Sequence, residues 1–179
     1  MKLAPVDCTT SPSLFSAAEI ELFERSIQSI PLKPSVVLRR GVSTLDNTFR
    51  SSQQLSVPQR NPFVYKLMMN VVRTNEQHFK YQIDRYLNQI DFVVYEPGCF
   101  FDWHTDPLPN RTDRKITTIV FLSDSSNYQG GRLYFKDPDR GTFRVDQEIG
   151  TVVHFNSTAM HTAMKVESGL RKVVVAWSG

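Results

Sequence analysis

The sequence contains very little cysteine. Cys8 and Cys99 are the only two, and they lie far apart in a chain of 179 residues. Two cysteines at that separation provide neither a disulfide framework nor a CxxC zinc or redox motif. We therefore expect both to be reduced thiols.

Long apolar runs and an excess of charge are also missing. No apolar stretch approaches the roughly 18 residues needed to cross a bilayer, and the N-terminal residues MKLAPVDCTTSPS lack the apolar core of a secretory signal. The 21 Lys and Arg residues nearly balance the 18 Asp and Glu residues, without a basic run. These absences predict a cytoplasmic protein with no membrane partner, and they give nucleic acid no support as a partner.

The hydrophobic content, 40% of 179 residues, is enough for one sizeable core. No internal repeat, low-complexity tract or linker divides the chain. We therefore expect a single domain over residues 1–179, with an N-terminal helical support at about 14–75 and a β core at about 79–178.

Two helices are predicted in the N-terminal part. The first, over 16–30, has Ser16 and Glu19 as a capping box and Pro31 as its stop. Its apolar residues at helical spacing are Ile20, Phe23, Ile27 and Ile30. The second, over 61–74, begins with Asn61 and Pro62 as a cap and first-turn pair, and we expect it to fray by Asn75. Its inward residues are predicted to be Phe63, Leu67, Met68, Val71 and Val72. Residues 39–60 show no regular pattern.

After residue 77 the apolar period changes to two. Short runs rich in β-branched and aromatic residues, separated by Gly, Pro, Asp and Asn, predict about eight strands: HFKYQI, QIDFVVY, KITTIVFL, GRLYF, GTFRV, GTVVHF, HTAMKV and RKVVVAW. Helices followed by many short strands indicate a mainly β fold with supporting N-terminal helices, such as a jelly roll.

The stretch FFDWHTD contains a candidate pair of metal ligands. In an extended segment His104 and Asp106 point to the same side, so an imidazole and a carboxylate meet. An iron site of two histidines and one carboxylate needs one further imidazole. The candidates are His78, His154 and His161. The alternative is a hydrogen-bonded surface loop.

The C-terminal stretch MHTAMKVESGLRKVVVAW favours His161. It places His161 at the start of one strand and Arg171 at the start of the next. Strand alternation puts Arg171 on the apolar face of Val173, Val175 and Trp177, where a guanidinium is costly without an anion. A carboxylate that accepts two hydrogen bonds is its natural partner. The alternative is that Arg171 reaches water at the strand end.

Three stretches resemble a known family: YEPGCFFDWHTD, RKITTIVFLSDSSNYQGGRLYF and GTVVHFNSTAMHTAMKVESGLRKVVVAW. They are similar to the double-stranded β-helix core, a jelly-roll, cupin-like fold, of iron(II)- and 2-oxoglutarate-dependent dioxygenases in the prolyl 4-hydroxylase-like branch. The resemblance covers roughly residues 79–178. Gly130 and Gly131 match the family's turn before a strand, whereas Arg132 stands where an acidic residue is more usual, which leaves the substrate preference open.

The resemblance assigns roles to residues of this chain. It implies that His104, Asp106 and His161 bind iron(II) and that Arg171, helped by Tyr95, binds the distal carboxylate of 2-oxoglutarate. Trp177 would lie beside this cosubstrate, and ascorbate is a candidate third cofactor. His154 is expected to be a strand residue, His78 a surface or junction residue, and Asp102 to point away from the site.

The resemblance implies a dioxygenase that hydroxylates a C–H bond of a peptidyl, prolyl-like substrate or of a small molecule or amino acid. Dioxygen is consumed, and succinate and CO2 are released. The alternatives are a nucleic-acid oxidative demethylase of the same chemistry and a non-catalytic metal-binding β-barrel module. Two roles stay open for Trp103, packing in the wall of the site and contact with the substrate. Two also stay open for the loop 107–115, a lid over the substrate and a solvated turn.

Overall fold

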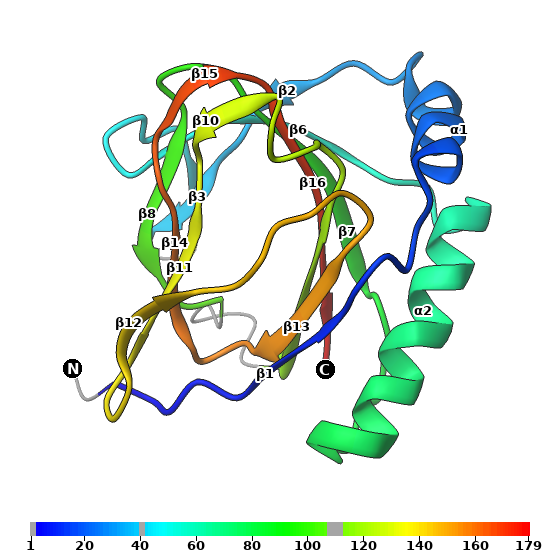
Figure 1. The fold of residues 1–179 in the computed structure, drawn as a ribbon, viewed down its shortest axis with the longest axis vertical. Coiled ribbons are helices and arrows are strands. Elements are labelled where there is room, and N and C mark those ends of the chain that lie inside the picture. Colours follow the sequence, from blue (N-terminus) through cyan, green and yellow to red (C-terminus); the bar gives the residue numbers. More distant parts are fainter. Residues whose placement is uncertain (1–2, 40–41, 107–112) are drawn as a thin grey trace.

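A computed structural model describes residues 3–39, 42–106 and 113–179 of the chain (Figure 1). Two antiparallel sheets face each other, and two helices lie beside the larger sheet (Figure 1). None of the described helices is long and apolar enough to cross a membrane.

The larger sheet has seven strands, and the smaller sheet has five. In spatial order the larger sheet contains β1 (Cys8–Ser11), β13 (Val152–Asn156), β9 (Ile116–Phe121), β16 (Arg171–Ser178), β7 (Gln89–Tyr95), β6 (Gln53–Ser56) and β2 (Lys33–Pro34). The smaller sheet contains β12 (Gly141–Arg144), β11 (Leu133–Asp137), β14 (Met160–Ala163), β8 (Phe100–His104) and β5 (Arg50–Ser51). Two further strand pairs are β10 (Tyr128–Gly130) with β15 (Val166–Gly169), and β3 (Val37–Arg39) with β4 (Val42–Thr44).

The chain winds back and forth between the two sheets. Strands β7, β9, β13 and β16 lie together in the larger sheet, while β8, β11, β12 and β14 lie together in the smaller one. This winding is a double-stranded β-helix, so the predicted mainly β, jelly-roll fold is confirmed.

The central strands of the larger sheet, β7, β9, β13 and β16, are buried on both faces. In β16, Val174 and Ala176 pack against the helices, whereas Val173 faces the smaller sheet. Burial on both faces explains why strands such as RKVVVAW are almost continuously apolar. The same alternation turns every second residue of β16 towards the interior between the sheets, where the candidate site lies.

Helix α1 (Ala17–Ile27) is shorter than predicted. The capping box is present, because the Ser16 hydroxyl accepts a hydrogen bond from the Glu19 backbone N–H and the Glu19 carboxylate accepts one from the Ser16 backbone N–H. The helix ends at Ile27 rather than Ile30, because the backbone N–H groups beyond it donate to the carbonyl three residues back instead of four. The Ile30 N–H, for example, donates to the Ile27 carbonyl at 2.9 Å. Ile30 still packs against the core from this tightened turn.

Helix α2 (Pro62–Thr74) begins as predicted, with the Asn61 side chain accepting from the Phe63 backbone N–H at 3.0 Å. It does not fray at Asn75. Instead it continues into a π-helical turn, Asn75–Phe79, and the buried Asn75 amide donates to the Tyr81 carbonyl at 2.9 Å. The predicted strand HFKYQI is therefore wrong, because this turn and the irregular segment after it occupy its residues.

Several short strands were not predicted from the sequence. The region 39–60 was expected to be irregular, but it contributes β5 to the smaller sheet and β6 to the larger one. Strand β6 has the sequence QQLS, whose single apolar residue gives no alternating signal. The segment from β5 to β6 therefore crosses from one sheet to the other at the edge of the barrel.

Candidate functional site

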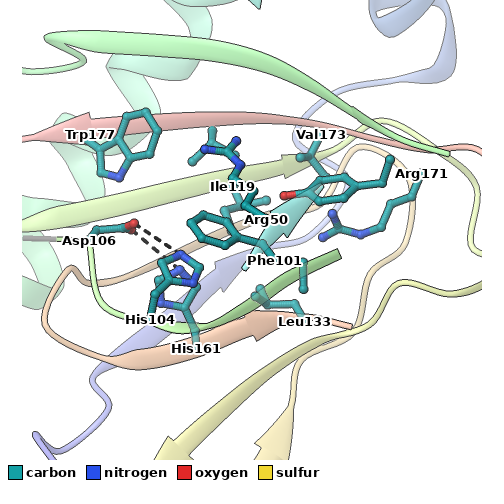
Figure 2. A pocket seen from close by; sticks show the side chains of 13 residues that line it. Arg50, Phe101, His104, Asp106, Ile119, Leu133, His161, Arg171, Val173 and Trp177 are labelled. Atoms are coloured by element: carbon teal, nitrogen blue, oxygen red, sulfur yellow. Dashed lines mark ion pairs between the residues drawn. The ribbon is translucent and has the colours of Figure 1, made fainter. Parts of the chain in front are cut away.

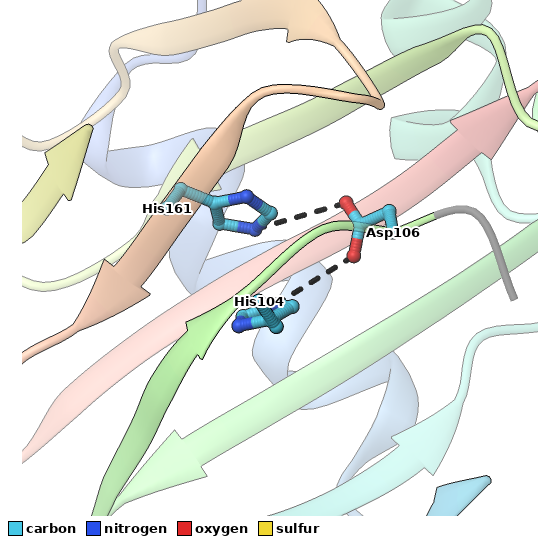
Figure 3. Close-up of side chains that lie close together, drawn as sticks. All are labelled: His104, Asp106 and His161. Atoms are coloured by element: carbon cyan, nitrogen blue, oxygen red, sulfur yellow. Dashed lines mark ion pairs between the residues drawn. The ribbon is translucent and has the colours of Figure 1, made fainter. Parts of the chain in front are cut away.

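Three side chains that could bind a metal converge between the sheets. His104 ends β8, Asp106 follows it, and His161 lies in β14 directly opposite His104 in the strand register. The Nε2 atoms of His104 and His161 lie 3.7 and 3.8 Å from the two carboxylate oxygens of Asp106 (Figure 3). One donor atom from each residue lies within 4.8 Å of the others.

Backbone carbonyls orient both imidazoles. His104 Nδ1 lies 2.6 Å from the carbonyl oxygen of Asp102, and His161 Nδ1 lies 3.0 Å from that of Ala159. A carbonyl only accepts, so each Nδ1 carries the proton and donates. Each Nε2 then presents its lone pair towards Asp106, as in metal-binding histidines.

Asp106 is held in its charged form. The Thr117 hydroxyl donates to Asp106 Oδ2 at 2.6 Å, and the Asp106 backbone N–H donates to the Ser157 carbonyl at 3.0 Å. Burial favours a higher pKa for this carboxyl group, but the two imidazoles, the Thr117 hydroxyl and the Trp177 indole outweigh it and lower the pKa. The group is therefore a carboxylate at neutral pH.

His104 is held in its neutral form. Burial lowers its pKa to about 3, and a proton on the neighbouring His161 would act in the same direction. The positive charge of Arg50 acts in the same direction. A neutral imidazole beside a charged carboxylate is the combination that binds a divalent cation.

A cavity extends from this cluster to Arg171, and its lining includes Tyr95, Ile119, Leu133 and Val173 (Figure 2). Arg171 is 2% exposed, so the alternative that it reaches water is wrong. Its Nε atom is buried and has no hydrogen-bond partner among the described residues. Val173, Val175 and Trp177 line the same cavity, as the strand alternation predicts.

The Gly130–Gly131 turn lies against the side chain of Arg171. Both glycines have positive φ, +71° and +59°, which is unfavourable for other residues. A Cβ atom at position 131 would lie 2.8 Å from Arg171 Cδ. The turn predicted before a strand is present, since it lies between β10 and β11.

The remaining histidines lie away from the cluster. His154 is fully buried in β13, where its Nδ1 accepts from the Thr118 hydroxyl at 3.0 Å and its Nε2 donates to Asn70 Oδ1 of α2 at 2.8 Å. Burial lowers its pKa to about 3. His78 is exposed and pairs with Asp7 at 2.7 Å. The prediction that His154 is a strand residue and His78 a surface residue is confirmed.

The sequence also led to expectations for Asp102, Trp103 and the loop 107–115. Asp102 is exposed and accepts from the Trp103 backbone N–H, outside the cluster, as expected. Trp103 does not line the cavity, and Lys136 Nζ lies 4.1 Å from the centre of its ring. Of the loop 107–115, residues 107–112 lie outside the described part of the chain.

Four residues near the cluster were missed by the sequence analysis. Phe101 stacks on His104 with ring centres 3.5 Å apart, and the guanidinium carbon of Arg50 lies over the Phe101 ring, 4.6 Å from its centre. Thr117 binds Asp106, and Arg114 lies 4.0 Å from the Trp177 ring centre. Strand alternation could have indicated Thr117, but Arg50 and Arg114 depend on how distant segments cross.

Residues 90–179, half of the chain, match the family model of the 2OG-Fe(II) oxygenase superfamily. The chain belongs to this superfamily. The chain is 31% identical over 118 residues to a PKHD-type hydroxylase of Crocosphaera subtropica. The matched region covers 62% of this chain and 51% of that protein. The chain spans 37%, 51% and 39% of the length of the first three curated relatives that it matches.

Two solved structures of low sequence identity share the superfamily fold. A prolyl hydroxylase from Trichoplax adhaerens, in complex with a hypoxia inducible factor peptide fragment, has a TM-score of 0.77 at 16% identity and covers 96% of this chain and 82% of its own. HygX from Streptomyces hygroscopicus, with nickel, 2-oxoglutarate and hygromycin B bound, has a TM-score of 0.69 at 14% identity with coverages of 96% and 82%.

Iron(II) and 2-oxoglutarate, the groups that this superfamily implies, fit the residues present. Two imidazoles and a carboxylate are the donor set of non-haem iron sites that leave positions open for other ligands. The buried guanidinium of Arg171, with its unpartnered Nε, fits one carboxylate of a dicarboxylic acid in the same cavity.

Proposed function

We propose that the protein is an iron(II)- and 2-oxoglutarate-dependent hydroxylase. The observation that carries this proposal is that one cavity is lined both by the His104, Asp106 and His161 cluster and by the buried Arg171 (Figure 2). A metal cluster alone would suit many reactions, but a buried guanidinium in the same cavity suits an acidic cosubstrate.

His104, Asp106 and His161 would hold iron(II). Iron and 2-oxoglutarate together supply the oxidative chemistry, in which dioxygen is consumed, succinate and CO2 are released and a substrate C–H bond is hydroxylated. Thr117 keeps the Asp106 carboxylate in place, and the Asp102 and Ala159 carbonyls keep the imidazole lone pairs directed at the metal position.

Arg171 would bind the distal carboxylate of 2-oxoglutarate, with Tyr95 beside it and Trp177 further along the same strand face. Burial of Arg171 strengthens such an ion pair because little water competes for the guanidinium. The apolar side chains of Ile119, Leu133 and Val173 line the space between. They would exclude water from the reaction and align the cosubstrate.

The substrate would be a peptide with a prolyl-like residue, or a small molecule or amino acid. The Trichoplax relative in complex with a peptide supports the first class, and HygX with hygromycin B bound supports the second. We also propose that residues 14–75 and 79–178 act as one dioxygenase domain, since the apolar faces of both helices are buried against the larger sheet. A cytoplasmic location and the use of ascorbate stay predictions.

The test is succinate formation by the purified, iron-loaded protein against a panel of proline-containing peptides, free amino acids and other small molecules. We expect succinate to form in the presence of 2-oxoglutarate, faster with one class of compound, and to be absent in Asp106→Ala. A protein that binds iron but neither binds nor consumes 2-oxoglutarate would instead be the non-catalytic module.

A further inference from the structure

A second hollow, called the outer chamber here, adjoins the cavity. It shares Arg50, Phe101 and Trp177 with the cavity and continues to Gln54, Asp91 and Arg114. In Figure 2, Asp106 and Trp177, which line both spaces, lie at the end of the cavity away from Arg171. A molecule in the outer chamber would therefore reach the cluster from that end. The outer chamber is thus the position for the substrate in the proposed function.

Most charged groups of the outer chamber already have partners. Asp91 is 2% exposed and accepts hydrogen bonds from Ser56 at 3.1 Å and from Gln89 at 2.8 Å. Arg114 donates to Gln89 Oε1 at 2.9 Å and to the Asp106 carbonyl at 3.3 Å. These two charges are therefore held in place by the protein itself.

Arg50 differs from them. Its Nε donates to the Ser52 hydroxyl at 3.2 Å, and its guanidinium carbon lies 4.6 Å from the centre of the Phe101 ring. Among the described residues no carboxylate lies within ion-pair distance of Arg50, and none accepts a hydrogen bond from its two terminal nitrogens. A half-buried guanidinium that is fixed at one side and open at the other is suited to an external anion.

The position of Arg50 is fixed by the strand pairing. It lies directly opposite Phe101 in the β5–β8 register, and Phe101 in turn stacks on His104. The stack therefore places a cation one ring away from the candidate metal ligand. Arg50 also lies outside residues 90–179, the part of the chain that matches the superfamily model.

We infer that Arg50 is a substrate-binding residue and that the substrate carries a carboxylate, which its terminal nitrogens bind in the space shared by the cavity and the outer chamber. This inference rests on the proposed function. A planar guanidinium binds a carboxylate through two parallel hydrogen bonds, and the Ser52 bond and the Phe101 ring hold its plane in advance. The distal carboxylate of 2-oxoglutarate already has Arg171.

The test measures binding without turnover, on protein loaded with nickel(II) and 2-oxoglutarate, by isothermal titration calorimetry. The probes are pairs that differ in one group: free amino acids with their amides, and acetylated, amidated prolyl peptides with Asp or Glu against the same peptides with Asn or Gln. The first arm detects a small acidic substrate, and the second detects an acidic side chain of a peptide.

We expect at least one acid to bind the wild type about tenfold or more tightly than its amide, as charge-assisted pairs do. Arg50→Gln should remove this preference, while Arg50→Lys should keep part of it, and both variants should bind 2-oxoglutarate within about twofold of the wild type. The matched control is Arg60→Gln, which removes one positive charge from an exposed position. Thermal unfolding verifies that the variants remain folded.

Two results would overturn the inference. One is the absence of any preference for an acid over its amide in the wild type, across both arms. The other is a loss of 2-oxoglutarate affinity of tenfold or more in Arg50→Gln with the acid preference intact, which would assign Arg50 to the cosubstrate. If the wild type does not bind 2-oxoglutarate at all, the proposed function itself fails, and the two failures are thereby distinguished.

Discussion

Tyr95 and Arg171 are direct partners across the β7–β16 pair, and the guanidinium carbon of Arg171 lies 5.0 Å from the centre of the Tyr95 ring. The two residues stand at opposite ends of the superfamily match in sequence, yet the antiparallel register brings them to the same end of the cavity. Together they form a buried site with one positive charge and one phenol, which is suited to a carboxylate.

Arg171→Ala should weaken 2-oxoglutarate binding roughly thirtyfold or more, because truncating one partner of a buried charge pair typically costs ~2–5 kcal/mol. Arg171→Lys keeps the charge but loses the planar fork, and it should lose less affinity. The measurement is an anaerobic titration of 2-oxoglutarate into iron-loaded protein, followed by the metal-to-ligand absorption band. Unchanged affinity in the Ala variant would refute the role proposed for Arg171.

Replacing His104, Asp106 or His161 with Ala should remove most of the bound iron(II), since each change leaves only two protein ligands. The wild type should bind one iron per chain. His154→Ala is the control, because His154 is buried but lies outside the cluster. Iron content after anaerobic loading and desalting gives the answer. Iron lost in the control and retained in His161→Ala would reverse the ligand assignment.

Gly131→Ala should weaken 2-oxoglutarate binding severalfold and lower the free energy of unfolding. The backbone has φ +59°, where a side chain costs about 1–2 kcal/mol, and the new Cβ would press on Arg171 Cδ at 2.8 Å. Gly141→Ala is a matched control with φ +71° and no atom within 4 Å of the new Cβ. Both variants should lose stability, but only the first should lose cosubstrate affinity. Equal cosubstrate affinity in the two variants would show that Gly131 does not support Arg171.

Leu67→Ala should lower the free energy of unfolding by ~2–5 kcal/mol, because Leu67 is fully buried between α2 and the larger sheet. Iron affinity of the folded fraction should not change. Tyr65→Ala, on the exposed face of the same helix, should change stability by less than about 1 kcal/mol. Denaturant titrations compare the variants, and reduced iron affinity at full stability in Leu67→Ala would contradict a purely supporting role of the helix.

His154 should make the metal-free protein less stable in acid. Burial lowers the pKa of His154 to about 3, whereas the same residue in the unfolded chain has the ordinary value near 6.5. The contribution of His154 to stability is therefore fully present above about pH 6.5. As the pH falls from there towards 3, the unfolded chain takes up a proton that the folded protein does not. The free energy of unfolding of the wild type, relative to that of His154→Gln, should therefore fall by about 2 kcal/mol as the pH is lowered from 6 to 4.5.

Urea titrations at several pH values between 4.5 and 7 would measure this shift. Leu22→Ala is the control, since Leu22 is exposed and carries no ionisable group. Parallel curves for the wild type and His154→Gln over this range would mean that His154 has the same pKa in the folded protein as in the unfolded chain, which would contradict the prediction.

The local signals in the sequence were sufficient for much of the fold and the candidate site. The capping box at Ser16, the strand alternation around Arg171 and the HxD spacing each depend on neighbouring residues, and each is found in the structure. The stretch from His161 to Arg171 favoured His161 over the other histidines, and the resemblance to a family then assigned it as a ligand, because sequence spacing alone does not pair β8 with β14.

The misses share a physical cause. The segment HFKYQI alternates like a strand, but Asn75 holds it in a π-helical turn through side-chain hydrogen bonds. Strands β1, β5 and β6 are short and polar, and they exist because a neighbouring strand offers its edge. Arg50 was missed for the same reason, since its position depends on a pairing with β8.

The crossing from β5 to β6 separates the candidate substrate contacts from the candidate metal and cosubstrate contacts. The candidate metal ligands and Arg171 lie on strands of the barrel, whereas Arg50 and Gln54 come from a short segment that bridges its edge. Changing the side chains of Arg50 and Gln54 alone leaves the pairing of β8 with β14 and of β7 with β16 in place. Arg50 and Gln54 are therefore the natural positions to change in order to redirect this protein towards new compounds.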